Sequence, residues 1–260
     1  MILEVYRDSL PYSIKEKSAL LKLGIITILS FLIVPIIFLF GYSYRIIQIG
    51  LHGVLLEGED PLATFGDLKQ LLIQGLKVIA VTISYSLIAI IISILGIFRF
   101  NLLNVTSFLS SFKISFQLDF GIGLTILLLV VWFITFIFTT TAISHMINRD
   151  SIKYAFKFKE LITIIKHVTV FEYLKFFISS IILAISFIIV GVLATETILN
   201  ILNIIALNFY NFTFKGSIGL NLTLAILAII FSFILIPIFI IVESRVASFI
   251  YNEDALIEEE

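Results

Sequence analysis

The sequence contains no cysteine, only four prolines, and few charged residues. Without cysteine the chain has no disulfide, no thiolate metal ligand and no cysteine nucleophile. Charged residues make up 13% of the 260 positions, whereas soluble domains carry about 25%. The formal net charge of −1 provides no field that would attract nucleic acid. These shortages argue against a disordered chain, a soluble enzyme and a nucleic-acid-binding protein.

Hydrophobic residues are in excess, at 60% of the chain and a mean hydropathy of +1.16. A helix needs about 20 mostly apolar residues to cross a bilayer, and five runs have this character: Leu23–Phe40, Val78–Ile97, Phe120–Ala142, Phe176–Leu193 and Leu222–Val242. The sequence therefore predicts an all-α, polytopic transmembrane helical bundle. It forms a single integral membrane domain over residues 1–260, with an N-terminal interfacial segment (1–19), the bundle (20–252) and an acidic tail (253–260).

Three stretches outside these runs predict amphipathic helices at the membrane surface. In Asn148–His167 the apolar residues Ile152, Ala155, Phe156, Ile162 and Ile165 alternate with a face carrying Lys153, Lys157 and Glu160, as in interfacial helices. Glu196–Phe214 carries a stripe of Glu and Asn, and Asp67–Lys77 leads into the second run.

The distribution of Lys and Arg predicts the orientation in the membrane. If the five runs alternate in direction, the loops on one side hold ten basic residues and those on the other hold three, so the richer side, with the 143–175 loop and the C-terminus, is cytoplasmic. Four more basic residues precede the first run and break this pattern. A re-entrant hairpin or a pair of short helices at residues 20–56, interrupted at Pro35, restores it, while a single crossing stays the alternative.

No pattern of catalytic or metal-ligating residues is present. The histidines His52, His145 and His167 are far apart and lack metal-site spacing, so we expect neither enzymatic activity nor a cofactor. Five ionisable residues near the ends of the runs are expected to anchor their helices: Arg99, His145, Glu196, Glu243 and Arg245. Serines in the second and fourth runs form the nearest approach to a polar core and are expected to allow close packing: Ser84, Ser86, Ser93, Ser179, Ser180 and Ser186.

The candidate binding residues lie at the expected membrane surfaces. Tyr42, Tyr44 and Arg45 follow the first run, where aromatic rings and a guanidinium are suited to lipid headgroups. Gly41 is expected to permit a bend there. Lys153 and Lys157 are the matching candidates on the surface helix. Asn104 and Asn211 lie in Asn-x-Thr sequons on the side predicted to be external, and are candidate glycosylation sites.

Several short elements occur together in a recognisable order. They are Gly41-Tyr-Ser-Tyr-Arg-Ile-Ile47, Phe65-Gly-Asp-Leu68 and Gly75-Leu-Lys77, followed by Ala155-Phe156 and Tyr173-Leu174. The chain resembles domain-of-unknown-function family 4013, multi-pass membrane proteins of archaea and bacteria, over roughly residues 8–252. The resemblance implies an integral protein of the cell membrane, of archaeal origin, and brings no assigned activity.

Two functions agree with these features. The leading hypothesis is a non-enzymatic scaffold or accessory subunit whose partners are the lipid bilayer and another membrane protein. The second is a small permease or lipid-handling transporter, in which serine hydroxyls line a path guarded by Arg45 or Glu196. A membrane enzyme is the third and least favoured alternative.

Overall fold

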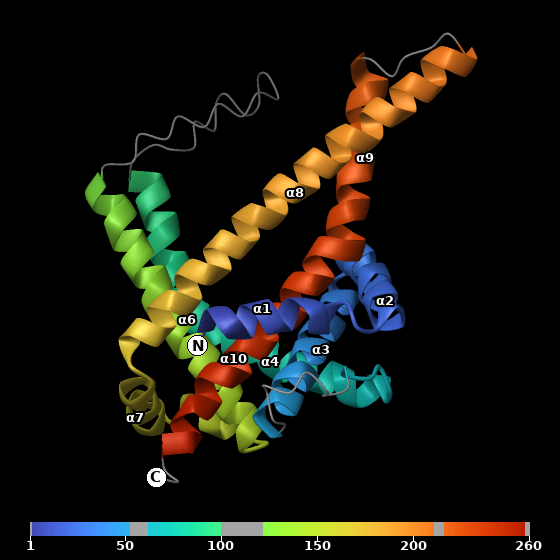
Figure 1. Ribbon diagram of the computed structural model, residues 1–260. Coiled ribbons are helices and arrows are strands. Elements are labelled where there is room, and N and C mark those ends of the chain that lie inside the picture. The colour runs from blue at the N-terminus through green and yellow to red at the C-terminus, as the bar shows by residue number, and fades with distance from the viewer. Residues whose placement is uncertain (1, 53–61, 100–121, 211–215, 258–260) are drawn as a thin grey trace.

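The computed structural model describes residues 2–52, 62–99, 122–210 and 216–257, and throughout these ranges the regular elements are helices (Figure 1). The all-α prediction is confirmed. Five helical stretches are long and apolar enough to cross a membrane: Val34–His52, Leu68–Leu95, Ile126–Asn148, Val170–Leu207 and Asn221–Asn252. The predicted number of spans is therefore confirmed, but their boundaries differ.

The first helix, α1 (Ile2–Ser13), lies across the bundle (Figure 1). Its sequence places Val5, Tyr6 and Tyr12 on one face, all of them buried. Glu4 and Arg7 lie on the exposed face. This three-to-four-residue spacing is the pattern of a helix with one face on the protein core.

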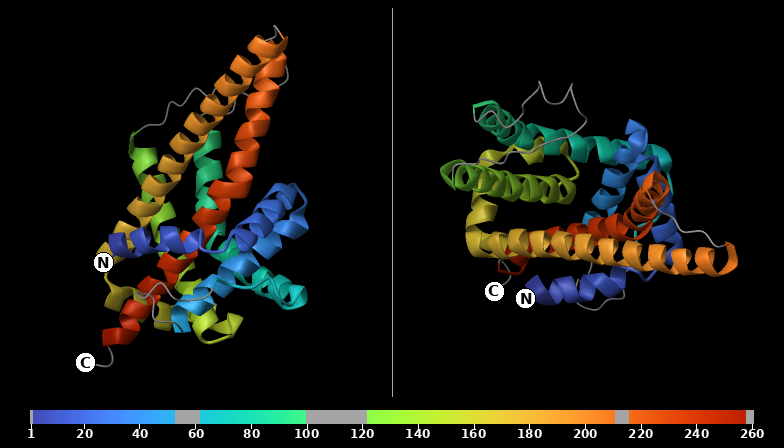
Figure 2. Two further views of the ribbon diagram at one scale, coloured as in Figure 1. Left: turned by 45° about the vertical axis from the view of Figure 1, so that its right-hand side comes forward. Right: turned by 90° about the horizontal axis from the view of Figure 1, so that it is seen from above.

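The next two helices form the hairpin predicted at residues 20–56. Helix α2 (Lys17–Ile28) and helix α3 (Ile33–His52) are joined by a 3-10 turn, η1 (Leu29–Phe31), and run in opposite directions (Figures 1 and 2). The predicted span Leu23–Phe40 is thus wrong, because the chain reverses inside it. The break also does not lie at Pro35, which is in the first turn of α3, where a helix makes no use of the missing N–H. With 12 residues, α2 is about 18 Å long and too short to cross a bilayer.

Helix α4 (Leu68–Arg99) is continuous from its first turn into the second span. The expected separate surface helix at Asp67–Lys77 is therefore wrong. Helix α6 (Ile122–Asn148) packs beside α4, and the two form one pair (Figures 1 and 2).

Helices α3 and α4 approach each other through two glycines. A Cβ on Gly41 would collide with the backbone carbonyl oxygen of Leu71, and a Cβ on Gly75 would collide with that of Ile37. Each glycine thus meets the residue four positions before the other glycine, so the contact is reciprocal. Helix α3 continues through Gly41, which serves close packing and not the expected bend.

The link between the third and fourth spans contains two short helices instead of the single one predicted over Asn148–His167. They are a 3-10 helix, η2 (Ile152–Phe156), and α7 (Phe158–Val168). The buried side of α7 consists of Leu161, Ile164 and Val168, while the predicted apolar positions Phe156 and Ile162 are exposed. The break shifts the register, because Lys157 does not have helical backbone angles.

Helix α8 (Val170–Tyr210) has 41 residues, or about 62 Å, roughly twice the thickness of the hydrocarbon core. The second predicted surface helix, Glu196–Phe214, does not exist as a separate element: its described part continues α8. In Figure 1, α8 runs obliquely across the molecule.

The last span is bent. It consists of α9 (Gly216–Ile230), a π-helical segment, η3 (Phe231–Leu235), and α10 (Ile236–Ile257). Pro237 explains the bend, because it lacks an N–H and its ring would clash with the preceding turn of a regular α-helix. Gly24 of α2 and Gly191 of α8 pack directly against the rings of Phe233 and Phe231.

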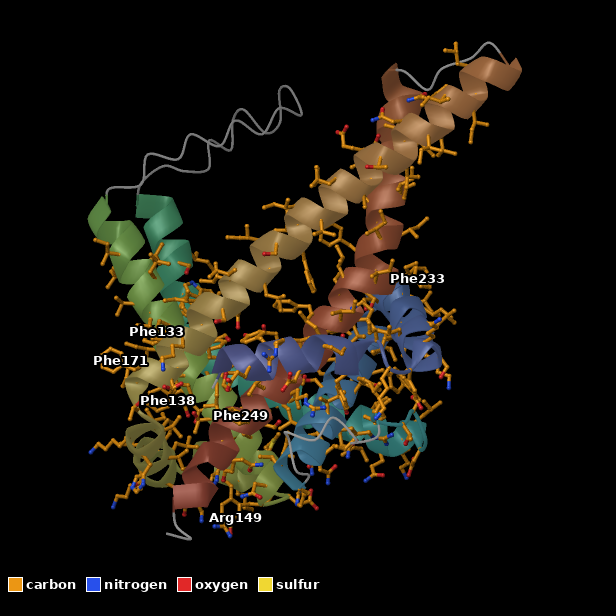
Figure 3. The ribbon with its side chains drawn as sticks, viewed as in Figure 1. Phe133, Phe138, Arg149, Phe171, Phe233 and Phe249 are labelled. Atoms are coloured by element: carbon orange, nitrogen blue, oxygen red, sulfur yellow. The ribbon has the colours of Figure 1, made fainter. Side chains whose placement is uncertain are left out.

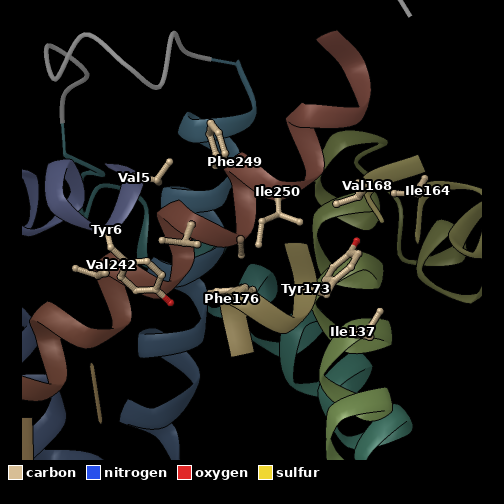
Figure 4. Close-up of a cluster of buried hydrophobic side chains, with 12 residues drawn as sticks. Val5, Tyr6, Ile137, Ile164, Val168, Tyr173, Phe176, Val242, Phe249 and Ile250 are labelled. Atoms are coloured by element: carbon tan, nitrogen blue, oxygen red, sulfur yellow. The ribbon is translucent and has the colours of Figure 1, made fainter. Parts of the chain in front are cut away.

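Buried residues gather in the half of the molecule where all the helices converge. One cluster joins α1, α6, α7, α8 and α10 around Tyr173, Phe176 and Ile250 (Figure 4). Two further clusters centre on Tyr44 and Tyr42 of α3. Away from this region the α4–α6 pair and the α8–α9 pair diverge, and their apolar side chains point outwards (Figures 1 and 3). That exposed surface is suited to lipid.

Candidate functional site

The two helix pairs converge on a cavity of about 400 Å³. Five of the helices contribute to its wall: α3, α4, α6, α8 and α10. The lining residues are Phe40, Ser43, Ile47, Ser86, Trp132, Thr135, Phe136, Thr139, Thr140, Ile143, Phe176, Phe177, Glu243, Ser244 and Ala247. The wall is thus largely aromatic and aliphatic, with several hydroxyl groups and one carboxylate.

Glu243 supplies that carboxylate from α10. The Tyr6 hydroxyl of α1 donates a hydrogen bond to Oε1 (3.0 Å), and the Ser180 hydroxyl of α8 donates one to Oε2 (2.6 Å). The Tyr6 and Ser180 hydroxyls are also 3.0 Å apart. Burial, and then the nearby Glu243, raise the pKa of Tyr6 above its usual range, so Tyr6 keeps its proton and remains a donor. Figure 4 shows Tyr6 beside Val242, the residue preceding Glu243.

The sequence predicts that Glu243 anchors the end of a span, and this prediction is wrong. Helix α10 continues well beyond it to Ile257, and the carboxylate is held between three helices. Arg245 and His145 also lie inside the protein, with 3% of each residue exposed. The Arg245 guanidinium lies 3.9 Å from the ring centroid of Tyr12, a cation–π contact.

Hydroxyl groups form the rest of the polar wall. The Ser43 and Ser244 hydroxyls are 2.6 Å apart and join α3 to α10. The Thr139 hydroxyl on α6 is buried and has no hydrogen-bond partner within the described part of the chain. Buried polar groups normally have such a partner, so Thr139 is an unsatisfied polar group within this wall.

Aromatic rings form much of the remaining wall. The ring centroids of Phe136 and Phe176 are 4.9 Å apart, and those of Phe136 and Phe177 are 5.2 Å apart. Trp132, the single tryptophan of the chain, donates its indole N–H to the Ser93 hydroxyl (3.1 Å). Trp132 is 40% exposed and lines the cavity.

The serines expected to approach a polar core and to allow close packing have different surroundings. Ser84, Ser93 and Ser186 donate to carbonyls of their own helices, each at 2.7 Å. Ser180 instead binds Glu243, and Ser86 lines the cavity. Hydroxyl residues in two separate spans indicate a polar interior. The sequence alone does not show which of these hydroxyls lie close together.

Tyr42 and Tyr44, predicted to contact lipid headgroups, lie in the protein interior with 0% and 1% of each residue exposed. The Tyr42 ring stacks on Phe65 at 4.6 Å. The Tyr44 hydroxyl donates to Asp150 Oδ1 at 3.2 Å. Both side chains therefore contact protein in this structure and not headgroups.

Arg45, the third of these candidates, fixes the segment before α4. Its guanidinium donates to the backbone carbonyls of Thr64 and Gly66, both at 2.5 Å, and of Asp67 at 3.2 Å. Its Nε donates to the Gln74 side chain at 3.0 Å. A guanidinium has five donors in a fixed plane, so Arg45 can hold several carbonyls at once.

Lys153 and Lys157 are exposed, and their contact with lipid headgroups remains a prediction. Lys157 pairs with Glu160 at 2.8 Å and lies 3.9 Å from the ring centroid of Tyr154. Hydrogen bonds from Lys157 and then from His145 hold the pKa of Glu160 below its ordinary value, and the bond to Glu160 raises the pKa of Lys157. Asn104 and Asn211 lie outside the described residues.

The long apolar helices and the largely apolar cavity at their convergence define a multi-pass membrane protein of the helical-bundle class. More particularly, the chain belongs to the DUF4013 family of proteins of unknown function, whose family model matches residues 28–199. The match contains the elements from Gly41 to Tyr173-Leu174 on which the resemblance depends, and it is shorter than the expected 8–252. Comparison with curated proteins and with solved structures gave no match. Within the described ranges no group of three or more acidic or histidine side chains could hold a metal ion.

Proposed function

We propose that this protein is a small permease or lipid-handling transporter that takes an amphiphilic molecule from the bilayer into the five-helix cavity. The observation that carries the proposal is the cavity itself, whose lining combines a carboxylate, hydroxyl groups and aromatic rings. An ionisable group within a span is costly and typically functional. The proposed role is binding and movement without chemical conversion.

Access from the bilayer supports this role. Trp132 lines the cavity and is partly exposed on α6 within a candidate span. The α4–α6 and α8–α9 pairs diverge beyond the cavity (Figure 1). An amphiphile can therefore place its polar group against the hydroxyls and the carboxylate of the cavity while its apolar tail extends between the two helix pairs into lipid.

The test is transport in proteoliposomes that contain a phospholipid with an unmodified, amine-bearing headgroup and a fluorescent label on one acyl chain. Bleaching by a membrane-impermeant reductant reports how fast the labelled lipid leaves the inner leaflet. We expect the wild-type protein to accelerate this exchange over protein-free vesicles. Ser86→Leu, which fills the cavity, should return the rate towards that of protein-free vesicles, whereas Ser84→Leu, on the exposed side of the same helix, should not.

The scaffold hypothesis predicts a different result. A scaffold gives no exchange above protein-free vesicles, and mass spectrometry of the natively purified protein then finds another membrane protein in stoichiometric amount. The location in the cell membrane, the cytoplasmic side of the 143–175 loop and the archaeal origin remain predictions from the sequence.

A further inference from the structure

We infer that the molecule bound in the cavity carries a cationic amino group, which pairs with Glu243 and packs against the aromatic rings that line the cavity. This inference rests on the proposed function and names the class of its substrate. It starts from the charge balance of the cavity. Glu243 is the ionisable residue among those that line it, and the described lining includes no Lys, Arg or His.

Within the described ranges, the protein supplies the Glu243 carboxylate with hydrogen bonds from neutral groups. The two donors are the hydroxyls of Tyr6 and Ser180. Arg245, two residues away on α10, places its guanidinium over the Tyr12 ring. Buried carboxylates are costly unless paired with a cation, so a positively charged ligand completes this site.

The remaining lining agrees with an ammonium group. Trp132, Phe136, Phe176 and Phe177 contribute rings to the same cavity, and the negative face of an aromatic ring attracts ammonium and quaternary ammonium ions. Ammonium hydrogens are donors, and the lining includes hydroxyl residues, such as Ser86 and Thr135, whose oxygens are acceptors. An anionic headgroup would meet the carboxylate with repulsion, and a purely apolar molecule would leave it unpaired.

The experiment uses Trp132 as the reporter, because it is the only tryptophan in the chain and lines the cavity. The full-length protein in nanodiscs of zwitterionic lipid is titrated with octylamine, octanol or octanoate, which share one tail length, and Trp132 fluorescence is recorded. Each amphiphile is compared between wild type and Glu243→Gln, so that its partitioning into the lipid cancels. We expect octylamine to bind wild type at least tenfold more tightly than Glu243→Gln, with octanol binding unchanged.

Tyr6→Phe separates a binding role of Glu243 from a merely structural one. This variant removes a hydrogen bond to the carboxylate but keeps the negative charge, so octylamine should retain its preference over octanol. If Glu243 only fastens α1, both variants alter all three titrations alike and the inference fails. Where Glu243→Gln does not fold, the wild-type titrations with octylamine and octanol, each corrected for its partitioning into protein-free nanodiscs, decide the question.

The outcomes also distinguish this inference from the proposed function. Equal saturable binding of octylamine and octanol, unaffected by Glu243→Gln, overturns the cationic substrate and leaves the transporter standing. Fluorescence that responds to no amphiphile in a saturable way contradicts the cavity as a binding site, and the proposed function with it.

Discussion

Single residues decide how closely the helices approach, most clearly at Gly41 and Gly75. In both cases the atom that an added Cβ would meet belongs to the backbone of the opposite helix. A backbone carbonyl cannot rotate away as a side chain does, so the two helices would have to separate.

We predict that Gly75→Ala destabilises the protein by about 1–3 kcal/mol, the usual cost of overpacking. The Cβ would lie 2.8 Å from the carbonyl carbon of Ile37 and collide with its oxygen. The measurement is the thermal unfolding midpoint in detergent, which should fall by several degrees. Gly66→Ala is the matched control, because the nearest atom to its Cβ is Thr64 Oγ1 at 3.8 Å. Equal midpoints for the two variants would contradict the close approach.

At the scale of elements, the segment formed by η2 and α7 is attached to the spans by polar contacts. The Tyr85 hydroxyl of α4 donates to the Ala155 carbonyl at 2.6 Å. Glu160 of α7 contacts His145 Nε2 on α6 at 2.9 Å. This second contact joins two elements and includes a titratable carboxylate.

The attachment of α7 is predicted to weaken in acid. The pKa of Glu160 is lower in the folded protein than its ordinary value of 4.5, so its contribution to stability is present above that value and is lost as the pH falls through the folded pKa. Amide hydrogen exchange of residues 152–161, corrected for intrinsic rates, should rise about two- to fivefold between pH 5 and pH 3. Glu160→Gln should exchange faster than wild type at pH 5 and should change less between pH 5 and pH 3.

Glu172→Gln provides the control for this measurement. Glu172 forms a similar pair with Lys175, but within α8 alone, so its loss leaves the attachment of α7 intact. A wild-type pH profile in Glu160→Gln would show that the carboxylate does not hold this segment.

The identity of the elements can be predicted from the sequence, whereas their boundaries and partners cannot. Apolar composition identifies the spans because lipid requires it. Composition does not show that the chain reverses at Leu29–Phe31 or that α8 is continuous. Glu243 follows the last residue of the predicted fifth run, so a hydropathy argument ends the span there. The helix continues because Tyr6 and Ser180, distant in sequence, satisfy the carboxylate. The cavity depends on such long-range contacts, which is why sequence reasoning misses it.

At the scale of the whole molecule, α1, α7 and the C-terminus occupy the same half, away from the tips of α8 and α9 (Figure 2). The α2–α3 hairpin produces this arrangement, because the chain runs out along α2 and back along α3. Had α2 continued into α3 as one helix, α1 would lie at the opposite end from α7.

We predict that residues 4 and 153 face the same side of the membrane and that residue 221 faces the other. All three positions are exposed, and the natural chain has no cysteine, so Glu4→Cys, Lys153→Cys and Asn221→Cys each introduce a unique thiol. An impermeant thiol reagent added to intact cells should label only Asn221→Cys. Labelling of Glu4→Cys together with Asn221→Cys would refute the hairpin as the arrangement in the membrane.

The length of α8 has a mechanical consequence. Ser180, which contacts Glu243 beside the cavity, lies near one end of this helix, and Tyr210 ends it about 45 Å further along. If α8 rotates about Ser180, next to the carboxylate, its far end moves much further than the residues beside the cavity. A rotation of about 10° around Ser180 would displace the far end of α8 by roughly 8 Å. A displacement too small to alter the packing at the cavity would therefore be several times larger at the opposite end of the helix.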